Sequence, residues 1–579
     1  MSGASPTSGW PAMSIAQAHA ILTGPGTVAE VVEAEVHGVR IKVWKNLPPT
    51  LGSVVELART HGEATFLVHE DERVSYEAFY RAVGAFAREL QAAGVRKGDR
   101  VALAMRNLPE WVVCAYGAAV AGAIATPLNA WWTGPELEYG LADSGARVLI
   151  VDAERYGRLA EHLRSCPALE RIYVSREADE IAHPLVVRLE DVLGEPGAWE
   201  RLPDQPLPDA GLGTDDDAAL FYTSGTTGKP KGAVCTHRGI NGNIFTSGVA
   251  VARAYLRRGE APPTPDPADP QWCNLVAVPF FHVTGFIAML NPAMARGAKL
   301  VMMRRWDTER ALQLIERERV TQTGGVPTIA WQILEHPDRA KYDLSSLQLV
   351  AYGGAPSAPE LVRRLKSTFA PLWPANGWGM TETSGTVTTH GFEDYQNRPD
   401  SCGPPVPVFE LQIREPADGV TVLPTGEVGE LWTKGPIARG YWNKPQATAE
   451  TFVDGWLRTG DLARLDEEGF CYIVDRAKDM LIRGGENIYC IEVENVLYDH
   501  PAVMDAAVVG VAHKTLGEEP GAVVVLKPGA SVDEAELRAH VAERLAAFKV
   551  PVAVRFLPET LPRNANGKVL KNELKQLFA

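Results

Sequence analysis

Cysteine is scarce in the sequence and is not arranged in pairs. The chain has 579 residues and seven scattered cysteines, none of them in a C-x-x-C pair: Cys114, Cys166, Cys235, Cys273, Cys402, Cys471 and Cys490. A disulfide framework or a structural zinc site would need paired thiols at regular spacing. We therefore expect reduced thiols in a cytoplasmic protein, most of them acting as small buried hydrophobic side chains.

Long apolar runs and an excess of positive charge are also missing. No uninterrupted apolar stretch could span a bilayer, and the N-terminus lacks the basic-then-apolar pattern of a signal peptide. The net charge is −15. Because cation–phosphate contacts dominate nucleic-acid binding, this charge argues against a nucleic-acid partner. Small-molecule partners are expected instead, without an integral membrane segment. The oligomeric state stays open, with a homodimer as one candidate.

The chain is long enough for at least two domains, because one hydrophobic core rarely holds 579 residues. Residues 1–50 form a weakly patterned leader. After it, Ser75 is placed to cap a helix in which apolar side chains recur at spacings of three and four, and Gly94 is placed to end it. Short apolar strands such as 101–104 and 148–151 then alternate with helices. This alternation predicts βαβ units, a mostly parallel sheet and an α/β fold.

One stretch has the chemistry of a phosphate-binding loop. Residues 223–232, TSGTTGKPKG, directly follow an apolar run at 218–222 that reads as a buried strand. Glycines let backbone N–H groups approach an anion closely, while the hydroxyls and lysines add donors and positive charge. A plain surface loop is the alternative, but ten consecutive small, polar or cationic residues after a buried strand argue against it. The ordinary nucleotide P-loop does not fit, since only two residues separate Gly225 from Gly228 and a proline follows Lys229.

This loop resembles the phosphate loop of the adenylate-forming (ANL) superfamily. That superfamily contains acyl- and aryl-CoA synthetases, adenylation domains of peptide synthetases and beetle luciferases. Further motifs similar to those of the superfamily follow in its order: 279–285 (PFFHVTG), 350–356 (VAYGGAP), 376–382 (NGWGMTE), 455–462 (GWLRTGDL), 475–479 (DRAKD) and 561–568 (LPRNANGK). The resemblance extends from about residue 50 to the end of the chain.

The resemblance implies a division into two domains after the leader. Residues 51–475 would form a large AMP-binding α/β domain with two mostly parallel sheets and a β-barrel part near residues 400–475. Residues 476–579 would form a small, mobile α+β lid domain. The lid would rotate on Lys478.

The resemblance also implies the nucleotide-binding residues. Trp378 stands where tyrosine is usual and would stack on adenine, and Asp461 would bind the ribose hydroxyls. Thr381 would contact the α-phosphate, and Glu382 and Thr226 would hold Mg²⁺. The full set implied for ATP and CoA is Thr223, Ser224, Gly225, Thr226, Thr227, Gly228, Lys229, Gly354, Ala355, Pro356, Asn376, Gly377, Trp378, Gly379, Met380, Asp461, Ile473, Arg476, Lys478, Gly484 and Gly485.

Catalytic and acyl-pocket residues follow from the same resemblance. Lys568 would be the adenylation lysine, acting with Thr381, Glu382 and His282, and Gly484-Gly485 would line the pantetheine tunnel. His282 taken alone would more often be a packed core residue. The implied acyl pocket consists of His282, Val283, Gly324, Gly325, Gly353, Gly354 and Gly379. Its glycines suggest a roomy pocket, unless some of them serve only the backbone turns.

The predicted function is that of an AMP-forming acid:CoA ligase using ATP, Mg²⁺ and coenzyme A. A carboxylic acid would give acyl-AMP and pyrophosphate, and then acyl-CoA and AMP; a medium- or long-chain fatty acid is favoured. The alternatives are an aryl or arylalkanoic acid as substrate, or an amine or carrier-protein thiol as acceptor. A non-catalytic ATP- or acyl-binding protein is disfavoured because Glu382, Asp461, Arg476 and Lys568 are all present.

Overall fold

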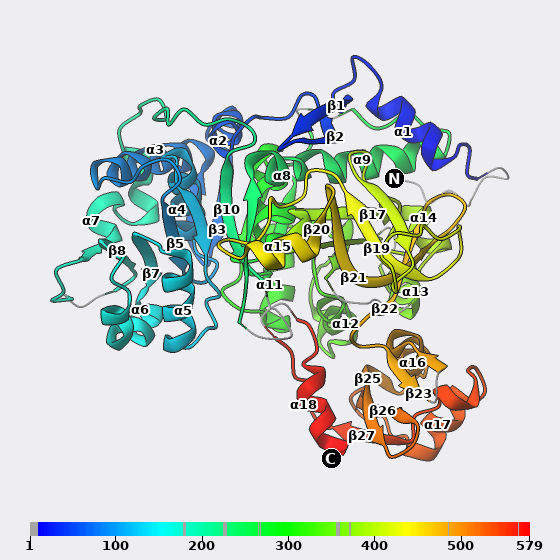
Figure 1. Ribbon diagram of the computed structural model, residues 1–579. Coiled ribbons are helices and arrows are strands. Elements are labelled where there is room, and N and C mark those ends of the chain that lie inside the picture. Colours follow the sequence, from blue (N-terminus) through cyan, green and yellow to red (C-terminus); the bar gives the residue numbers. More distant parts are fainter. Residues whose placement is uncertain are drawn as a thin grey trace.

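The computed structural model describes residues 10–177, 181–223, 229–264, 266, 268–354, 359–369, 372–483, 486–564 and 567–578. These residues form a large body and a smaller C-terminal domain, drawn below it in Figure 1. No helix in the described part is both long and apolar enough to cross a bilayer.

A seven-stranded sheet forms one half of the large body, in the order β11-β10-β6-β5-β7-β8-β9. All neighbours are parallel except β11, which pairs antiparallel with β10. The strands are β5 (Arg100–Ala104), β6 (Ile124–Pro127), β7 (Val148–Asp152), β8 (Arg171–Ser175), β9 (Val186–Arg188), β10 (Asp217–Tyr222) and β11 (Gly232–Thr236). Helices of this half are α5 (Gly134–Ser144), α6 (Ala153–Leu159) and α7 (Leu189–Leu193).

An eight-stranded sheet forms the other half, in the order β17-β16-β15-β14-β12-β13-β3-β4. Its six inner strands are parallel, and β4 and β17 are antiparallel edges. The strands are β3 (Thr65–His69), β4 (Glu72–Ser75), β12 (Cys273–Val276), β13 (Lys299–Met302), β14 (Gln322–Gly325), β15 (Leu349–Gly353), β16 (Trp373–Met380) and β17 (Gly385–Gly391). Helices α11 (Thr308–Glu318), α12 (Pro327–Glu335), α13 (Pro359–Thr368) and α14 (Phe392–Asn397) belong to this half.

One continuous apolar core joins the two sheets. It contains Phe66 of β3, Val101 of β5 and Trp111 of α4. The helices that contribute to it include α2 (Leu51–Arg59), α3 (Tyr76–Ala92), α4 (Pro109–Val120), α8 (His237–Asn241) and α10 (Asn291–Ala295). The predicted helix after Ser75 is confirmed as α3, because the Ser75 side chain accepts the Ala78 N–H at 3.1 Å as an N-cap.

An antiparallel sheet of five strands follows where the barrel part was expected. Its strands are β18 (Glu410–Arg414), β19 (Gly429–Lys434), β20 (Phe452–Val453), β21 (Trp456–Leu465) and β22 (Cys471–Arg476), with α15 (Pro445–Thr451) beside them. The sheet ends at Arg476, two residues before the expected hinge. The predicted α/β fold with parallel sheets is therefore confirmed.

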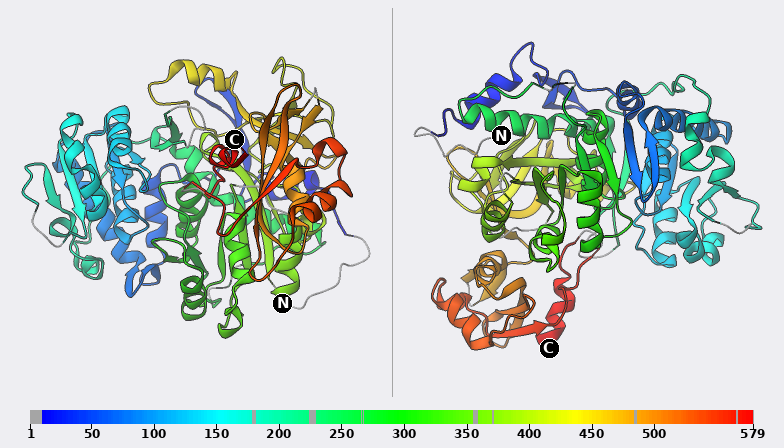
Figure 2. Two further views of the ribbon diagram at one scale, coloured as in Figure 1. Left: turned by 90° about the horizontal axis from the view of Figure 1, so that it is seen from below. Right: turned by 180° about the vertical axis from the view of Figure 1, so that it is seen from behind.

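The C-terminal domain has a core of its own, built on a second five-stranded sheet. The strands are β23 (Leu481–Arg483), β24 (Glu486–Ile488), β25 (Val503–His513), β26 (Gly517–Leu526) and β27 (Ala553–Leu557). Helices α16 (Cys490–Tyr498), α17 (Glu534–Ala542) and α18 (Lys571–Lys575) complete the domain, which Figure 2 shows from two further sides.

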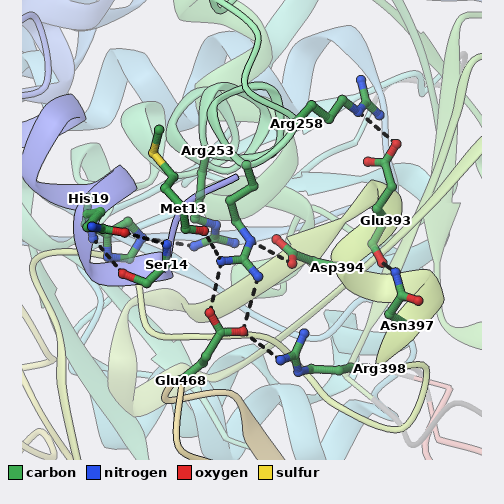
Figure 3. Close-up of polar contacts among 12 residues, drawn as sticks. Met13, Ser14, His19, Arg253, Arg258, Glu393, Asp394, Asn397, Arg398 and Glu468 are labelled. Atoms are coloured by element: carbon green, nitrogen blue, oxygen red, sulfur yellow. Dashed lines mark hydrogen bonds and ion pairs between the residues drawn. The ribbon is translucent and has the colours of Figure 1, made fainter. Parts of the chain in front are cut away.

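Residues 10–50 are built into the large body through buried charges. They form α1 (Ile15–Thr23), β1 (Val31–Val36) and β2 (Val39–Trp44), and α1 packs on α9 (Asn243–Arg257). Arg257, fully buried, contacts Asp394 of α14 at 2.9 Å and donates to the Met13 carbonyl at 2.8 Å. Figure 3 labels Met13, Asp394 and Glu468 in this network. Glu468, in the turn between β21 and β22, lies 3.1 Å from the same guanidinium. This network ties four distant parts of the chain together.

Candidate active site

The candidate site lies at the carboxyl ends of the parallel strands. Strand β10 ends at Tyr222, immediately before the phosphate loop, and β15 and β16 end at Gly353 and Met380, within two other predicted motifs. In open α/β sheets this edge is where ligands bind. The fold therefore gathers motifs that are far apart in the sequence.

The phosphate loop connects two antiparallel strands. Thr223 donates its N–H to the Lys231 carbonyl at 2.8 Å, so the loop is closed at its base. The two lysines lie over aromatic faces, with Lys229 Nζ 4.8 Å from the Tyr139 ring centre and Lys231 Nζ 5.0 Å from that of Tyr441. The predicted ligands Ser224, Gly225, Thr226, Thr227 and Gly228 lie outside the described residues, as do Ala355, Pro356, Gly484 and Gly485.

The motif at residues 376–382 ends in a short turn that contains Glu382. Strand β16 carries Asn376, Gly377, Trp378, Gly379 and Met380, and the 3₁₀ turn η5 (Thr381–Thr383) follows it. Glu382 is buried, and the Tyr441 hydroxyl donates to its Oε1 at 2.7 Å. Burial, followed by the Glu382 charge, raises the pKa of Tyr441 well above its usual range, so this hydroxyl stays a donor. Sequence reasoning missed Tyr441, which lies outside the recognised motifs.

Asp461 is held from two sides. It is buried on β21, and the Trp378 indole N–H donates to its Oδ2 at 2.9 Å. On the other side Arg476, its partner across β21 and β22, places Nε 3.5 Å from Oδ1. Ile473 lies on the same strand as Arg476. The structure thus brings together three predicted nucleotide ligands: Trp378, Asp461 and Arg476.

Lys568 reaches this group from the C-terminal domain. Its N–H donates to Asn564 Oδ1 at 3.0 Å, and Gly567 turns the chain at a φ of +73°. Burial, followed by the charges of Arg476 and Lys478, lowers the pKa of the Lys568 ammonium to about 8, against the opposing effect of Asp461 and Glu382. Lys568 therefore shares one electrostatic environment with both carboxylates.

Contacts between the domains hold the lid in this arrangement. A Cβ atom on Gly567 would lie 2.7 Å from Val326 Cγ1, so the turn before Lys568 packs closely on the large domain. Arg363 of α13 pairs with Asp499 at 3.2 Å, and Lys527 Nζ lies 5.8 Å from the Trp331 ring centre on α12. Lys568 is accordingly supplied to the large-domain site by a packed interface.

His282 borders a small cavity. The cavity has a volume of about 40 Å³ and is lined by Pro127, Asn129, Trp132, Tyr222, Thr223, Pro230, Phe281 and His282. The His282 Nε2 atom is buried without a hydrogen-bond partner among the described residues. Burial, and next the Lys568 charge, lowers the pKa of His282 to about 3, so the ring is neutral. A cavity this small holds a few water molecules, so an acyl chain or a thiol could enter only if side chains moved.

Most of the predicted pocket glycines are required by the backbone around them. A Cβ atom would lie 1.7 Å from the Ala351 oxygen at Gly324, 2.6 Å from the Gly377 oxygen at Gly353, and 2.0 Å from the Gly385 oxygen at Gly379. Gly325 and Gly354 have φ values of +143° and +74°, which strain other residues. The number of glycines therefore does not measure the volume of the pocket. Their assignment to the acyl pocket, with Val283, stays a prediction.

Two family models match the chain. The model described as "AMP-binding enzyme" covers residues 54–442, and that described as "AMP-binding enzyme C-terminal domain" covers residues 492–568. The chain belongs to the AMP-binding enzyme family. The resemblance to adenylate-forming enzymes is thereby confirmed, and with it the prediction of an AMP-forming acid–thiol ligase.

Named relatives of this AMP-binding enzyme act on different acids. A feruloyl-CoA synthase from Amycolatopsis sp is 37% identical over 90% of this chain and 98% of its own length. A long-chain-fatty-acid–CoA ligase from Bacillus subtilis is 36% identical over 84% of this chain and 86% of its own length. The crystal structure of the anthranilate CoA ligase AuaEII with anthranoyl-AMP matches with a TM-score of 0.80, at 28% identity over 91% of this chain and 97% of that chain.

Proposed function

We propose that this AMP-binding enzyme joins a carboxylic acid to coenzyme A through an acyl-AMP intermediate. The observation that carries the proposal is the position of Lys568. This residue belongs to the C-terminal domain, yet it lies close enough to Glu382 and Asp461 of the large domain for their charges to act on it. A cation at that position suits a reaction that must bring two anions together, a carboxylate and an α-phosphate.

In the first half-reaction the carboxylate oxygen attacks the α-phosphorus of ATP, and pyrophosphate leaves. Lys568 offsets the repulsion between the anions and stabilises the charge that builds on the α-phosphate in the transition state. With a pKa of about 8, its ammonium is mostly charged at pH 7. Asp461 and Trp378 would hold the ribose and adenine, and Thr381 would contact the α-phosphate.

Glu382 would hold Mg²⁺. It is a buried carboxylate whose Oε1 is fixed by Tyr441, and hard oxygen ligands of this kind suit the ion. The described residues contain no cluster of three metal-binding side chains, which fits an ion held by one carboxylate, phosphate oxygens and water. Bound there, Mg²⁺ would neutralise phosphate charge. Thr226, the second proposed ligand, lies outside the described residues.

In the second half-reaction the thiol of coenzyme A attacks the acyl-AMP carbonyl, and AMP leaves. The small cavity beside His282 would have to widen before the thiol could enter. The lid would rotate between the two steps, as in other enzymes whose domains close differently around successive reactions. Lys568 would leave the site with the lid, because adenylation is then complete.

A cationic and aromatic surface beside the His282 cavity supports coenzyme A as acceptor. Trp131 is exposed, and its backbone N–H donates to Oδ1 of the cavity-lining Asn129 at 2.8 Å. The Arg106 guanidinium lies 5.0 Å from the centre of the Trp131 ring. Burial, and then the charge of Arg155, lowers the pKa of Arg106 to about 10, which leaves its guanidinium charged at neutral pH. An adenine ring and a phosphate would both find partners there.

For the acid we propose a medium- or long-chain fatty acid. The similarity to the long-chain-fatty-acid–CoA ligase supports it, whereas the glycine count no longer does. The second candidate is an aryl acid, which the 37% identity to a feruloyl-CoA synthase favours.

The test is pyrophosphate release from Mg·ATP with a panel of fatty and aryl acids, with and without coenzyme A. Release that is accelerated by coenzyme A and yields the mass of an acyl-CoA supports the ligase and identifies the acid. Release that is indifferent to coenzyme A, with acyl-AMP accumulating, would instead favour an amine or a carrier-protein thiol as acceptor.

A further inference from the structure

A single hydrogen bond connects two nucleotide motifs that lie on different sheets. Trp378 lies on β16 of the eight-stranded sheet, and Asp461 lies on β21 of the antiparallel sheet. The indole N–H donates to Asp461 Oδ2 at 2.9 Å. A tyrosine, the residue usual at this position of the motif, has its donor at the end of the ring, whereas tryptophan has it on the ring edge. The contact thus depends on the residue that distinguishes this chain from the common motif.

The backbone fixes where the indole ring lies. A β-bulge interrupts the pairing of β16 with β17, because Trp378 pairs with Thr388 and Gly379 with Thr386. Bulges redirect side chains beside active sites. A Cβ at Gly379 would lie 2.0 Å from the Gly385 oxygen, so the strand position next to Trp378 tolerates only glycine.

Packing restricts the ring further. The half-buried Trp378 packs against two apolar clusters, one around Val387 and Phe409 and one around Leu431 and Ala463. Its side chain therefore loses rotamer freedom before any ligand binds, and the indole N–H is presented in a fixed direction.

The same bond leaves part of the carboxylate available. An ionised carboxylate offers about four acceptor positions. Trp378 occupies one acceptor position on Oδ2, and Arg476 Nε lies 3.5 Å from Oδ1. The backbone of Asp461 is held separately, because its N–H donates to the Thr459 hydroxyl at 3.1 Å. Because both oxygens have a partner, the carboxylate cannot rotate freely. Its remaining acceptor positions are therefore pre-oriented.

We propose that Trp378 is a positioning residue for the ribose. Through its indole N–H it orients the Asp461 carboxylate toward the vicinal hydroxyls, and it thereby contributes to the selection of ribonucleotides over deoxyribonucleotides. This inference rests on the proposed use of ATP, and it adds a role separate from stacking on adenine. It predicts that the hydroxyls of the sugar and the N–H of Trp378 are energetically coupled.

The experiment compares ATP, 2′-deoxy-ATP and 3′-deoxy-ATP on wild-type enzyme and on Trp378→Phe, which keeps a stacking ring but lacks the donor. We expect kcat/KM for ATP to fall roughly tenfold, mostly through KM, as for a hydrogen bond to a charged group. For at least one deoxy analogue, kcat/KM should fall by a several-fold smaller factor than it does for ATP. The preference for ATP over that analogue then shrinks in the variant.

Equilibrium binding of the same three nucleotides without any acid gives a second readout. It separates this inference from the proposed function, because a wild-type enzyme that binds ATP but never releases pyrophosphate would refute the ligase alone. An equal loss for all three nucleotides in Trp378→Phe would overturn the inference and leave only the stacking role.

Two further variants complete the design. Trp306→Phe is the matched control, since the Trp306 indole N–H donates to Gln332 at 2.7 Å away from the nucleotide residues; its nucleotide preference should equal that of wild type. If the melting temperature shows that Trp378→Phe does not fold, the nucleotide preference is measured on Trp378→Tyr instead. A wild-type preference in a folded Trp378→Tyr enzyme would contradict the need for the indole N–H.

Discussion

Lys568 is the residue whose surroundings say most about the reaction. Two other cations, Arg476 and Lys478, already lie near its ammonium, and burial removes water from it. Such an arrangement is unfavourable in the empty site and becomes favourable when an anionic α-phosphate enters. The residue is thus suited to stabilise charge that appears only with the substrate.

Removing this cation should separate the two half-reactions. We expect Lys568→Ala to lower the rate of pyrophosphate release by roughly 10²–10³-fold, as for one lost transition-state contact. Thioester formation from supplied acyl-AMP should change much less, because the lid has then withdrawn Lys568. Single-turnover measurements of each step provide the comparison. Equal losses of rate in both steps would contradict the proposal that the lid withdraws Lys568 before the thiol enters.

The low pKa of Lys568 predicts a pH dependence with a definite sign. The ammonium is charged below about pH 8 and neutral above it, so kcat/KM for pyrophosphate release should fall as the pH rises past about 8. In Lys568→Arg the guanidinium stays charged throughout, and any remaining activity should lack this fall. A decline of the same shape in both enzymes would assign it to another group.

Tyr441 should act on Mg²⁺ through Glu382. Tyr441→Phe removes the 2.7 Å hydrogen bond to Oε1 but keeps the ring, so the carboxylate loses its orientation. We expect the Mg²⁺ concentration needed for half-maximal pyrophosphate release to rise roughly tenfold. Tyr472→Phe is the matched control, since its hydroxyl donates to Asp466 at 3.1 Å outside the site. A Mg²⁺ requirement unchanged in Tyr441→Phe would exclude this role.

At the scale of elements, the sequence predicts best where the signal is local. The helix after Ser75, the strand before the phosphate loop and the βαβ alternation each depend on residues a few positions apart, and the structure contains all three. Contacts between distant elements leave no such signal. Tyr441 reaches Glu382 across 59 positions, and Trp378 reaches Asp461 across 83.

The N-terminal segment shows the same limit. Residues 10–50 have weak periodicity because polar contacts, more than a long apolar face, hold α1 in place. His19 accepts from Arg253 at 3.1 Å, and burial, followed by the charges of Arg253 and Arg257, lowers the pKa of His19 to about 3. The start of this helix carries a local signal, the capping box of Ser14 and Gln17, but its position in the fold depends on α9, more than 200 residues away.

The ion pair beneath α1 should be essential for stability. Arg257→Met keeps the aliphatic stem but leaves the buried Asp394 without its closest cation, which costs roughly 3–5 kcal/mol in comparable buried pairs. The melting temperature should fall accordingly. Arg258→Met, which breaks the less buried pair with Glu393, should lower it less.

Removing the orphaned charge tests the cause. In Arg257→Met/Asp394→Asn the buried carboxylate that lost Arg257 is itself neutral, so the double variant should regain part of the lost melting temperature. If the double variant is no more stable than Arg257→Met alone, the loss arises from packing and not from the charge.

At the scale of the molecule, we propose that rotation of the C-terminal domain lets one site serve two steps. The contacts through Val326, Arg363 and Trp331 include an ion pair and a cation–aromatic contact, and partly polar interfaces between domains permit domain motion. Around Lys478 the chain forms a turn in which Asp479 and Met480 donate to the Arg476 carbonyl at 2.9 and 3.0 Å, and Ala477 donates its N–H to the Gly460 carbonyl at 3.0 Å. Lys478 lies inside this turn and is the proposed pivot.

Restricting the pivot should therefore damage the second step more than the first. Lys478→Pro fixes φ at about −65° and limits the rotation, but it also removes the charged side chain. We expect acyl-AMP to form at a rate within a few-fold of wild type but to accumulate, with acyl-CoA formation slowed by at least tenfold if rotation is required. Lys478→Ala, which loses the side chain and keeps the backbone freedom, separates hinge motion from the charge of Lys478. If Lys478→Pro and Lys478→Ala slow acyl-CoA formation equally, the side chain is responsible and the pivot lies elsewhere.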